Sequence, residues 1–208
     1  MTKVLIVDDE RLIRDLFTRY VQSASDRYAL AGAIADASNA EVCCFEDKVD
    51  LILMDICTAK KSSGLAAAAK IKKRFPHIKI IIVTSAPEFR FLEMARAAGA
   101  ESFWYKDVSE EELLDVMDRT MAGESIYPDK TPEVQIGLVG SYDLSPKEIE
   151  VLYWLSVVGS NKLIAEKMGV SEDGVNYHIR SLKEKTGCES KTELAILATT
   201  SKLVLPNY

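Results

Sequence analysis

The stretches VLIVDDE at residues 4–10, LILMD at 51–55 and IIIVT at 80–84 decide the fold of this chain of 208 residues. Each is a run of Val, Ile and Leu that ends in a polar residue, which is typical of strands buried in a parallel sheet. They predict strands over 3–7, 50–54 and 79–83, and residues 28–34 and 101–104 are weaker candidates for two more.

Stretches with apolar residues at helical spacing separate these strands. They predict helices over 12–21, 65–75, 88–98 and 109–122. Gly99 marks the end of one helix, and Ser109 with Glu112 three residues later marks the start of another. Strands that alternate with helices predict an α/β fold with a doubly wound, five-stranded parallel sheet over residues 1–122. Functional groups of such a sheet lie beyond the carboxyl ends of its strands.

The second half of the chain has a different pattern. Residues 123–142 contain scattered Gly and Pro without a sustained period, and we interpret them as a linker. After them the pattern is purely helical, which predicts an all-α domain of four helices over 143–208. The expected helices run from Ser145 to about residue 158, and over 160–168, 171–185 and 191–202, with Gly187 ending the third.

Composition limits the class of protein. With 48% hydrophobic and 28% charged residues, the chain is neither disordered nor collagen-like. Its apolar runs are too short for a membrane span, and charged residues from Asp8 onward interrupt the first one, so we expect no signal peptide and a cytoplasmic protein. The four cysteines show no CxxC or Cys/His cluster, which favours reduced thiols over disulfides or zinc ligands.

Charge is distributed unevenly between the halves. The net charge is -6, but residues 144–208 carry eight of the 26 Lys and Arg and eight of the 32 Asp and Glu. The excess of negative charge therefore lies entirely before residue 144, which suggests two modules with different partners.

Three carboxylates are expected at one edge of the sheet. Asp8 and Asp9 follow the first strand, and Asp55 follows the third. Two carboxylates 4 Å apart repel by about 4 kcal/mol at an effective dielectric near 20, so a hard cation such as Mg²⁺ would stabilise the cluster. Helix capping is the alternative role for these acids. Thr84 and Lys106, after the fourth and fifth strands, would face an anion on Asp55.

The order Asp-Asp, Asp, Thr, Lys over residues 3–122 resembles the receiver domain of two-component response regulators, a flavodoxin-like fold. VLIVDDE, LILMD, IIIVTSA at 80–86, AAGA at 97–100 and FWYKD at 103–107 carry the likeness. It implies that a sensor histidine kinase phosphorylates Asp55 and that Mg²⁺ is required. It also implies that Asp9, Asp55 and the Cys57 carbonyl bind the metal directly and Asp8 through water, that Thr84 and Lys106 contact the phosphoryl group, and that Phe103 is the aromatic switch.

The loop after Asp55 departs from this family. The family commonly has a proline four residues on, where this chain has Ala59, and a glycine eight residues on, where this chain has Gly64 at nine. Lys60 and Lys61 lie between them. We expect phosphorylation to survive this longer loop, with an altered lifetime or partner choice. The Cys57 thiol is either inert or a redox-sensitive group beside the site.

The predicted helix over 171–185 has two distinct faces. Val175, His178 or Ile179, and Leu182 form an apolar stripe, whereas Asn176, Tyr177, Arg180 and Lys183 lie on the other side. Such a polar face offers hydrogen bonds to base edges and phosphates, although most polar helix faces are simply solvated. With the preceding helix and a turn at 168–171, the pattern is that of a helix-turn-helix.

Residues 143–204 resemble the LuxR-type (NarL/FixJ-type) DNA-binding domain, through SNKLIAEKMGVS at 160–171 and VNYHIRSLKEKTG at 175–187. The likeness places the helix from Ser171 in the major groove of double-stranded promoter DNA. It implies that Asn176, Tyr177 and Arg180 read bases, that Asn161, Lys162, Lys183 and Lys185 contact phosphates, and that His178 packs inward. The last helix, through Leu194, Leu197, Ala198 and Ser201, would form part of a homodimer contact.

Together these features predict a transcription regulator controlled by phosphorylation, and not an enzyme. RNA polymerase is a further candidate partner, and no membrane partner is expected. One alternative is a DNA-binding regulator whose receiver is not switched by phosphate, because of the altered loop. Another is a Mg²⁺-dependent phosphatase with Asp55 as nucleophile, which would leave residues 143–208 without a role. Control by release, in which an acidic receiver covers the DNA-binding face until phosphorylated, is a hypothesis about mechanism.

Overall fold

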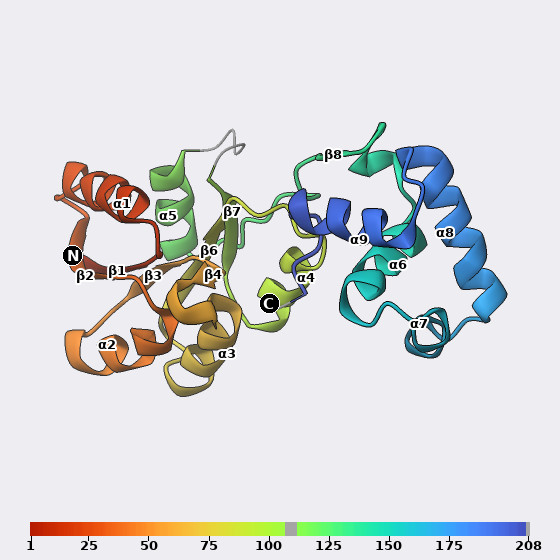
Figure 1. Ribbon diagram of the computed structural model, residues 1–208. Helices are drawn as coiled ribbons and strands as arrows, with labels where there is room; N and C mark the ends of the chain where they lie inside the picture. Colours follow the sequence, from red (N-terminus) through yellow and green to blue (C-terminus); the bar gives the residue numbers. More distant parts are fainter. Residues whose placement is uncertain (107–111, 207–208) are drawn as a thin grey trace. The chain divides into compact units, whose positions relative to one another are not determined.

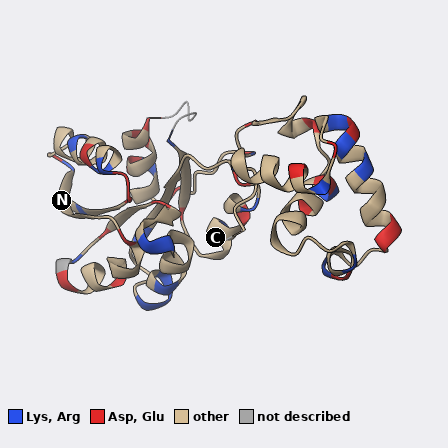
Figure 2. Cartoon of the chain, in the orientation of Figure 1, with Lys and Arg blue, Asp and Glu red and all other residues tan. Residues whose placement is uncertain are grey.

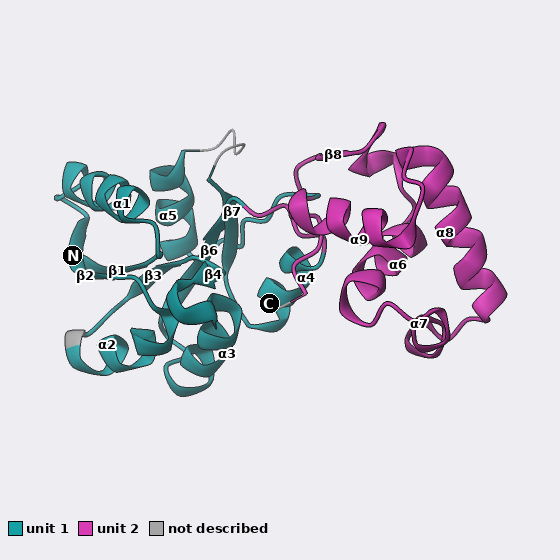
Figure 3. Ribbon diagram, in the orientation of Figure 1, with its two compact units in different colours: residues 1–85, 90–130, 208 teal, residues 86–89, 131–207 magenta. Residues whose placement is uncertain are grey.

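The structure is a computed structural model that describes residues 1–106 and 112–206. The expected helix start at Ser109 lies outside these residues. The chain divides into two compact units, one of residues 1–85 with 90–130 and one of 86–89 with the chain from 131 onward (Figure 3). No helix of the described residues has the length and apolar character that crossing a bilayer needs.

The first unit is built on a five-stranded parallel sheet, as the sequence pattern predicts (Figure 1). Its strands lie in the order β2-β1-β3-β6-β7. They are β1 (Thr2–Val7), β2 (Tyr28–Ile34), β3 (Leu51–Met54), β6 (Lys79–Thr84) and β7 (Ser102–Tyr105). All four residues of β3 are fully buried, because helices cover both faces of the sheet.

Five helices flank the sheet: α1 (Arg11–Ser23), α2 (Ala40–Asp47), α3 (Gly64–Arg74), α4 (Phe91–Ala97) and α5 (Leu113–Met121). Figure 1 shows α1 and α5 on one face and α2 and α3 on the other. Phe17 of α1 and Met117 of α5 belong to one apolar cluster with Ile6 of β1. The short helix α2 has no strong sequence pattern, and α4 begins at Phe91, three residues later than expected.

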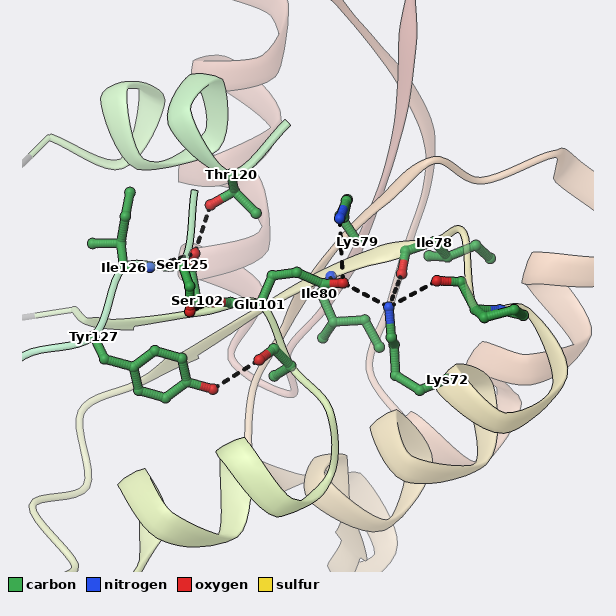
Figure 4. Close-up of polar contacts among 12 residues, drawn as sticks. Lys72, Ile78, Lys79, Ile80, Glu101, Ser102, Thr120, Ser125, Ile126 and Tyr127 are labelled. Atoms are coloured by element: carbon green, nitrogen blue, oxygen red, sulfur yellow. Dashed lines mark hydrogen bonds and ion pairs between the residues drawn. The ribbon is translucent and has the colours of Figure 1, made fainter. Parts of the chain in front are cut away.

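Polar side chains link neighbouring segments at the amino ends of the strands, as Figure 4 shows. The Lys72 ammonium donates to Glu101 Oε1 at 2.7 Å, and the other oxygen of Glu101 accepts from the Ile80 amide at 2.9 Å. The chain after α5 then lies along β7, where the Phe103 amide donates to the Ile126 carbonyl at 2.8 Å. This end of the sheet is therefore occupied by structural contacts, which leaves the carboxyl ends for chemistry.

The second unit consists of a small hairpin and four helices around one apolar core. Strands β8 (Gln135–Ile136) and β9 (Val139–Gly140) precede η3 (Ser141–Asp143), α6 (Pro146–Val157), α7 (Asn161–Met168), α8 (Glu172–Thr186) and α9 (Lys191–Thr200). Ile136 is fully buried in the same cluster as Leu152, Val175 and Leu194. The structure thus gives residues 131–142 local structure and core contacts, where a linker over 123–142 was expected.

The helix boundaries of this unit agree with the sequence signals. Ser145 and Glu148 form a reciprocal capping box at the start of α6. The Ser171 hydroxyl accepts from the Gly174 amide at 3.1 Å and caps α8. Gly187 ends α8 with φ of 78°, a left-handed conformation that favours glycine.

Candidate functional site

The three carboxylates converge at the carboxyl edge of the sheet, as predicted. Strand β1 pairs with β3, and the Asp55 amide donates to the Val7 carbonyl at 2.8 Å, so Asp55 lies beside the Asp8-Asp9 pair. One oxygen of each of the three carboxylates lies within 4.8 Å of the others. Asp8 and Asp55 are buried, whereas Asp9 is exposed.

Lys106 joins this cluster from the end of β7. Its ammonium lies 2.6 Å from Asp8 Oδ2 and 3.3 Å from Asp55 Oδ2, and its side chain is 4% exposed. The Lys106 amide donates to the Thr84 carbonyl at 3.0 Å, which holds the backbone of Lys106 beside the end of β6. Thr84 itself is 2% exposed. The structure therefore brings together five of the residues expected at this edge.

Burial and charge control how these groups ionise. Burial raises the pKa of Asp55 to about 7; the positive charge of Lys106 opposes this shift and the negative charge of Asp8 adds to it. Burial alone would lower the pKa of Lys106, but attraction to Asp55 and Asp8 outweighs it and raises that pKa. The Lys106 ammonium thus pairs with two of the three carboxylates, Asp8 and Asp55.

The donor set fits a hard divalent cation. Three carboxylates that share one small volume, with one of them open to solvent, match the oxygen ligands and retained waters that Mg²⁺ prefers. The Arg14 guanidinium donates to the Asp8 and Asp9 carbonyls at 2.7 and 2.9 Å and holds the turn that presents both acids. Asp8, Asp9 and Asp55 are thus the residues that would hold such an ion.

Phe103 is a buried residue of β7, whereas Cys57 is half-buried in the loop that follows Asp55. Phe103 is 2% exposed, and its ring lies 4.9 Å from that of Tyr105 and 6.1 Å from that of Tyr127. Cys57 begins the short strand β4 (Cys57–Thr58), two residues after Asp55. Its carbonyl as a metal ligand stays a prediction.

The lengthened loop after Asp55 is a closed hairpin. Strand β4 pairs antiparallel with β5 (Ser62–Ser63), and the Gly64 amide donates to the Ile56 carbonyl at 2.9 Å. A Cβ atom at Gly64 would lie 1.8 Å from the Asp55 carbonyl oxygen. This contact explains why the loop must end on glycine although it is one residue longer than the family pattern.

In the second unit, α8 presents the polar face that the sequence predicts. Tyr177 is 66% exposed, and Asn176 and Arg180 are exposed beside it, whereas Val175, Ile179 and Leu182 are buried. The positions of Lys and Arg along α8 are blue in the cartoon of Figure 2. An open groove runs along this face, lined by Asp173, Asn176, Tyr177, Arg180 and Lys183 among others. His178 is half-buried, as expected of a packing residue.

Hydrogen bonds connect α7 and α9 to this face. The Asn161 amide group donates to Asn176 Oδ1 at 2.6 Å, and the Lys191 ammonium donates to Asn161 Oδ1 at 2.8 Å. Lys162 is exposed on α7. Lys191 was not predicted as part of this face, because its position at the start of a helix gives no sign of its contact with Asn161.

The Lys185 ammonium donates to Glu148 Oε2 and the Asp143 carbonyl, both at 2.9 Å, and its side chain is 36% exposed, so its contact with phosphate stays a prediction. The expected subunit contact of α9 needs correction for two residues. Leu194 and Ala198 of α9 are fully buried in the unit's own core, so they cannot form a contact surface for a second subunit.

The fold and these two regions define a class of protein: an acidic parallel-sheet domain joined to a helix-turn-helix domain. Comparison with known proteins identifies both parts. Residues 4–118 match the model of the response regulator receiver domain, and residues 143–198 match that of bacterial regulatory proteins of the luxR family. The chain therefore belongs to the response regulators that carry a LuxR-type DNA-binding domain, a family of transcription regulators and not of enzymes.

Similar proteins match this chain over almost all of their own length. The response regulator protein VraR of Staphylococcus aureus is 30% identical over 97% of this chain and 98% of its own length. The uncharacterized transcriptional regulatory protein YxjL of Bacillus subtilis is 28% identical over 97% of both chains. RcsB of Salmonella enterica, solved bound to a promoter, shares the fold at a TM-score of 0.61 and 20% identity over 96% of this chain and 99% of that one.

Proposed function

We propose that a sensor histidine kinase transfers a phosphoryl group to Asp55, and that the phosphorylated protein binds promoter DNA as a dimer to control transcription. The observation that carries the proposal is the approach of the buried Lys106 ammonium to both Asp8 and Asp55, at 2.6 and 3.3 Å. An ammonium held there is placed to neutralise a phosphoryl group on Asp55.

The residues of the chain have separate tasks in this transfer. An Asp55 oxygen forms the new bond to phosphorus as the bond from phosphorus to the kinase histidine breaks in line, and the imidazole leaves. Lys106 favours the ionised, nucleophilic form of Asp55 and then pairs with the phosphoryl oxygens. Bound Mg²⁺, held by Asp8, Asp9, Asp55 and the Cys57 carbonyl, would supply further charge neutralisation.

Phosphorylation adds a charge of about -1.5 to -2 at a single buried edge. Thr84, at the end of the neighbouring strand, would donate its hydroxyl to the new group. We infer that Phe103, packed between Tyr105 and Tyr127, changes its position in response and so alters the surface near β7. This altered surface would in turn change DNA binding by the second unit.

Labelling with acetyl phosphate tests the first step. We expect Mg²⁺-dependent labelling of the wild-type protein and of Asp15→Ala, which removes an exposed aspartate of α1, and none of Asp55→Ala. Equal labelling of Asp55→Ala and wild type would reject Asp55 as the acceptor.

The DNA-binding part of the proposal assigns base contacts to Asn176, Tyr177 and Arg180, and phosphate contacts to Asn161, Lys162, Lys183 and Lys185. The exposure of Asn176, Tyr177 and Arg180 on α8 and of Lys162 at the start of α7 supports it; Asn161, Lys183 and Lys185 are half-buried. On α9, Leu197 and Ser201 are half-buried and Ile196 is 56% exposed, and we assign these residues to the contact with a second subunit. Sequencing of genomic DNA captured with and without a phosphoryl donor tests recognition and its control.

The closed hairpin after Asp55 favours one other function. A receiver whose loop cannot rearrange would hold the second unit in a DNA-binding state independent of phosphate. Identical promoter affinity of the wild-type protein before and after complete labelling of Asp55 would support that alternative and reject phosphorylation control. Either form of the regulator would act in the cytoplasm.

A further inference from the structure

The hairpin after Asp55 contains two strained residues. Lys60 and Lys61 have φ of 57° and 59°, in the left-handed region that is unfavourable for a residue with a side chain. No proline stiffens this loop, since residue 59 is alanine. Contacts with residues outside the hairpin would help to stabilise this conformation beside Asp55.

The segment between β2 and α2 supplies those contacts through Asp36. Asp36 Oδ1 accepts from the Ser62 hydroxyl at 2.7 Å, and also from the Ser38 hydroxyl at 2.6 Å and amide at 2.9 Å. Its other oxygen lies 3.2 Å from the Lys60 ammonium. Asp36 is 6% exposed. The hydrogen bonds from Ser38 and Ser62 hold the pKa of this carboxyl well below its usual range, so it stays ionised.

Thr58 and Ala59 complete the connection. The Thr58 hydroxyl accepts from the Ala37 amide at 3.1 Å and donates to the Ser62 carbonyl at 2.8 Å. The Ala59 amide donates to the Ala35 carbonyl at 3.0 Å. Residues 35–38 thus hold both strands of the hairpin; we call this set of contacts the Asp36 clasp.

The clasp acts on a hairpin that is anchored to the candidate site at both ends. Its first residue, Cys57, carries the carbonyl expected to bind the metal, and its last contact is Gly64 against the Asp55 carbonyl. Polar groups that orient a metal ligand from outside typically change metal affinity 10- to 100-fold when removed. We propose that Asp36 is a positioning residue that holds the Cys57 carbonyl and the Asp55 backbone for Mg²⁺ and phosphoryl binding; this rests on the proposed function.

Calorimetric titration of the full-length protein with Mg²⁺ alone tests the proposal. We expect Asp36→Ala to weaken Mg²⁺ binding about tenfold, because the hairpin loses its anchor. Asp36→Asn should bind within about threefold of wild type, since its amide oxygen still accepts from Ser38 and Ser62. Glu41→Ala is the matched control: it removes an acid of α2 that pairs with Arg74 outside the clasp, and we expect wild-type affinity.

Labelling by acetyl phosphate separates positioning from general damage. In Asp36→Ala, the Mg²⁺ concentration for half-maximal labelling should rise about tenfold, while the rate at saturating Mg²⁺ stays within about twofold of wild type. A variant that is merely unfolded would lose labelled fraction and would not recover at high Mg²⁺. If Asp36→Ala does not fold, Ser62→Ala takes its place with the same expectation at a smaller size.

The outcomes distinguish the two proposals. Wild-type Mg²⁺ affinity in a folded Asp36→Ala protein, or a defect that high Mg²⁺ does not correct, rejects the positioning role and leaves Asp55 as acceptor. Absence of Mg²⁺ binding and labelling in the wild-type protein rejects the proposed function itself. Additive losses in the Asp36→Ala, Ser62→Ala double variant also contradict the clasp, because residues that act through one contact should not add.

Discussion

The acidic edge of the first unit and the polar face of α8 in the second both depend on charged side chains, but they hold them differently. Lys106, Asp8 and Asp55 are nearly inaccessible to solvent and are fixed by neighbouring strands. Tyr177 and Arg180 project into solvent from a single helix, above a core of Val175, Ile179 and Leu182.

This difference has a physical consequence. A buried charge is strongly coupled to its partners, so removal of one group changes the ionisation and position of the others. An exposed helix face distributes its binding energy over several weakly coupled contacts, each replaceable by water. We therefore expect single substitutions to act most strongly where side chains are buried, in either unit.

The largest effect is expected in the core beneath α8. Ile136→Ala should destabilise the second unit by about 2–5 kcal/mol, because the residue is fully buried and its loss leaves a cavity. Urea denaturation followed by the fluorescence of Trp154, in a Trp104→Phe background, measures it. Leu138→Ala in the same hairpin is the control, since Leu138 is 77% exposed. Equal stability of Ile136→Ala and Leu138→Ala would show that the hairpin is not part of the core.

At the acidic edge, Lys106→Met should slow labelling by acetyl phosphate about 100-fold, since a preorganised charge that stabilises the transferring group is lost. The exposed Lys61, in the hairpin beside the site, provides the control as Lys61→Met, expected to stay near the wild-type rate. Rates within threefold of wild type for Lys106→Met would mean that the buried ammonium takes no part in the transfer.

The acidic edge and the buried Ile136 differ in how well the sequence predicts them. The acidic edge could be predicted because parallel strands end at one edge, so Asp8, Asp55 and Lys106 had to meet there once the strands were recognised. Ile136 lies in a stretch rich in Gly and Pro and was missed, because two-residue strands leave no periodic pattern.

The Asp36 clasp was missed for a related reason. Its hydrogen bond to Ser62 joins residues 26 positions apart, and it depends on the path of two loops that no local pattern specifies. The base-reading assignment of Asn176, Tyr177 and Arg180 came from the family resemblance, since the sequence alone indicates only a polar helix face. Sequence thus predicts sites that regular elements position, and fails for those that loops build.

Glu148 should make the stability of the second unit depend on pH. Burial alone would raise its pKa, but hydrogen bonds from Lys185, the Ser145 amide and Ser181 lower the pKa to about 2. Because the folded pKa lies below that of an unfolded glutamate, this contribution to stability is present above about pH 4.5 and is lost as pH falls toward 2. It amounts to about 2–3 kcal/mol at most.

Unfolding free energy of the second unit, measured from pH 7 to pH 3, tests this linkage. Glu148→Gln should lower stability at pH 7 by about 2 kcal/mol and flatten its decline in acid, because the variant has no carboxyl to protonate. Glu150→Gln, on the same helix and paired only at the surface with Lys147, should follow the wild-type curve. A wild-type slope in Glu148→Gln would contradict the assignment.

The smallest effects should come from the exposed face of α8, where two basic residues are expected to act differently. Arg180→Ala should weaken binding to a cognate promoter about tenfold and reduce discrimination against other sequences, since a base contact is lost. Lys162→Ala should weaken binding to all sequences alike and reduce the slope of log affinity against log salt by about 1, since a phosphate contact is lost. Fluorescence anisotropy with cognate and unrelated duplexes at several salt concentrations measures both. If Arg180→Ala leaves discrimination unchanged, Arg180 contacts only the DNA backbone, and base reading would rest on Asn176 and Tyr177.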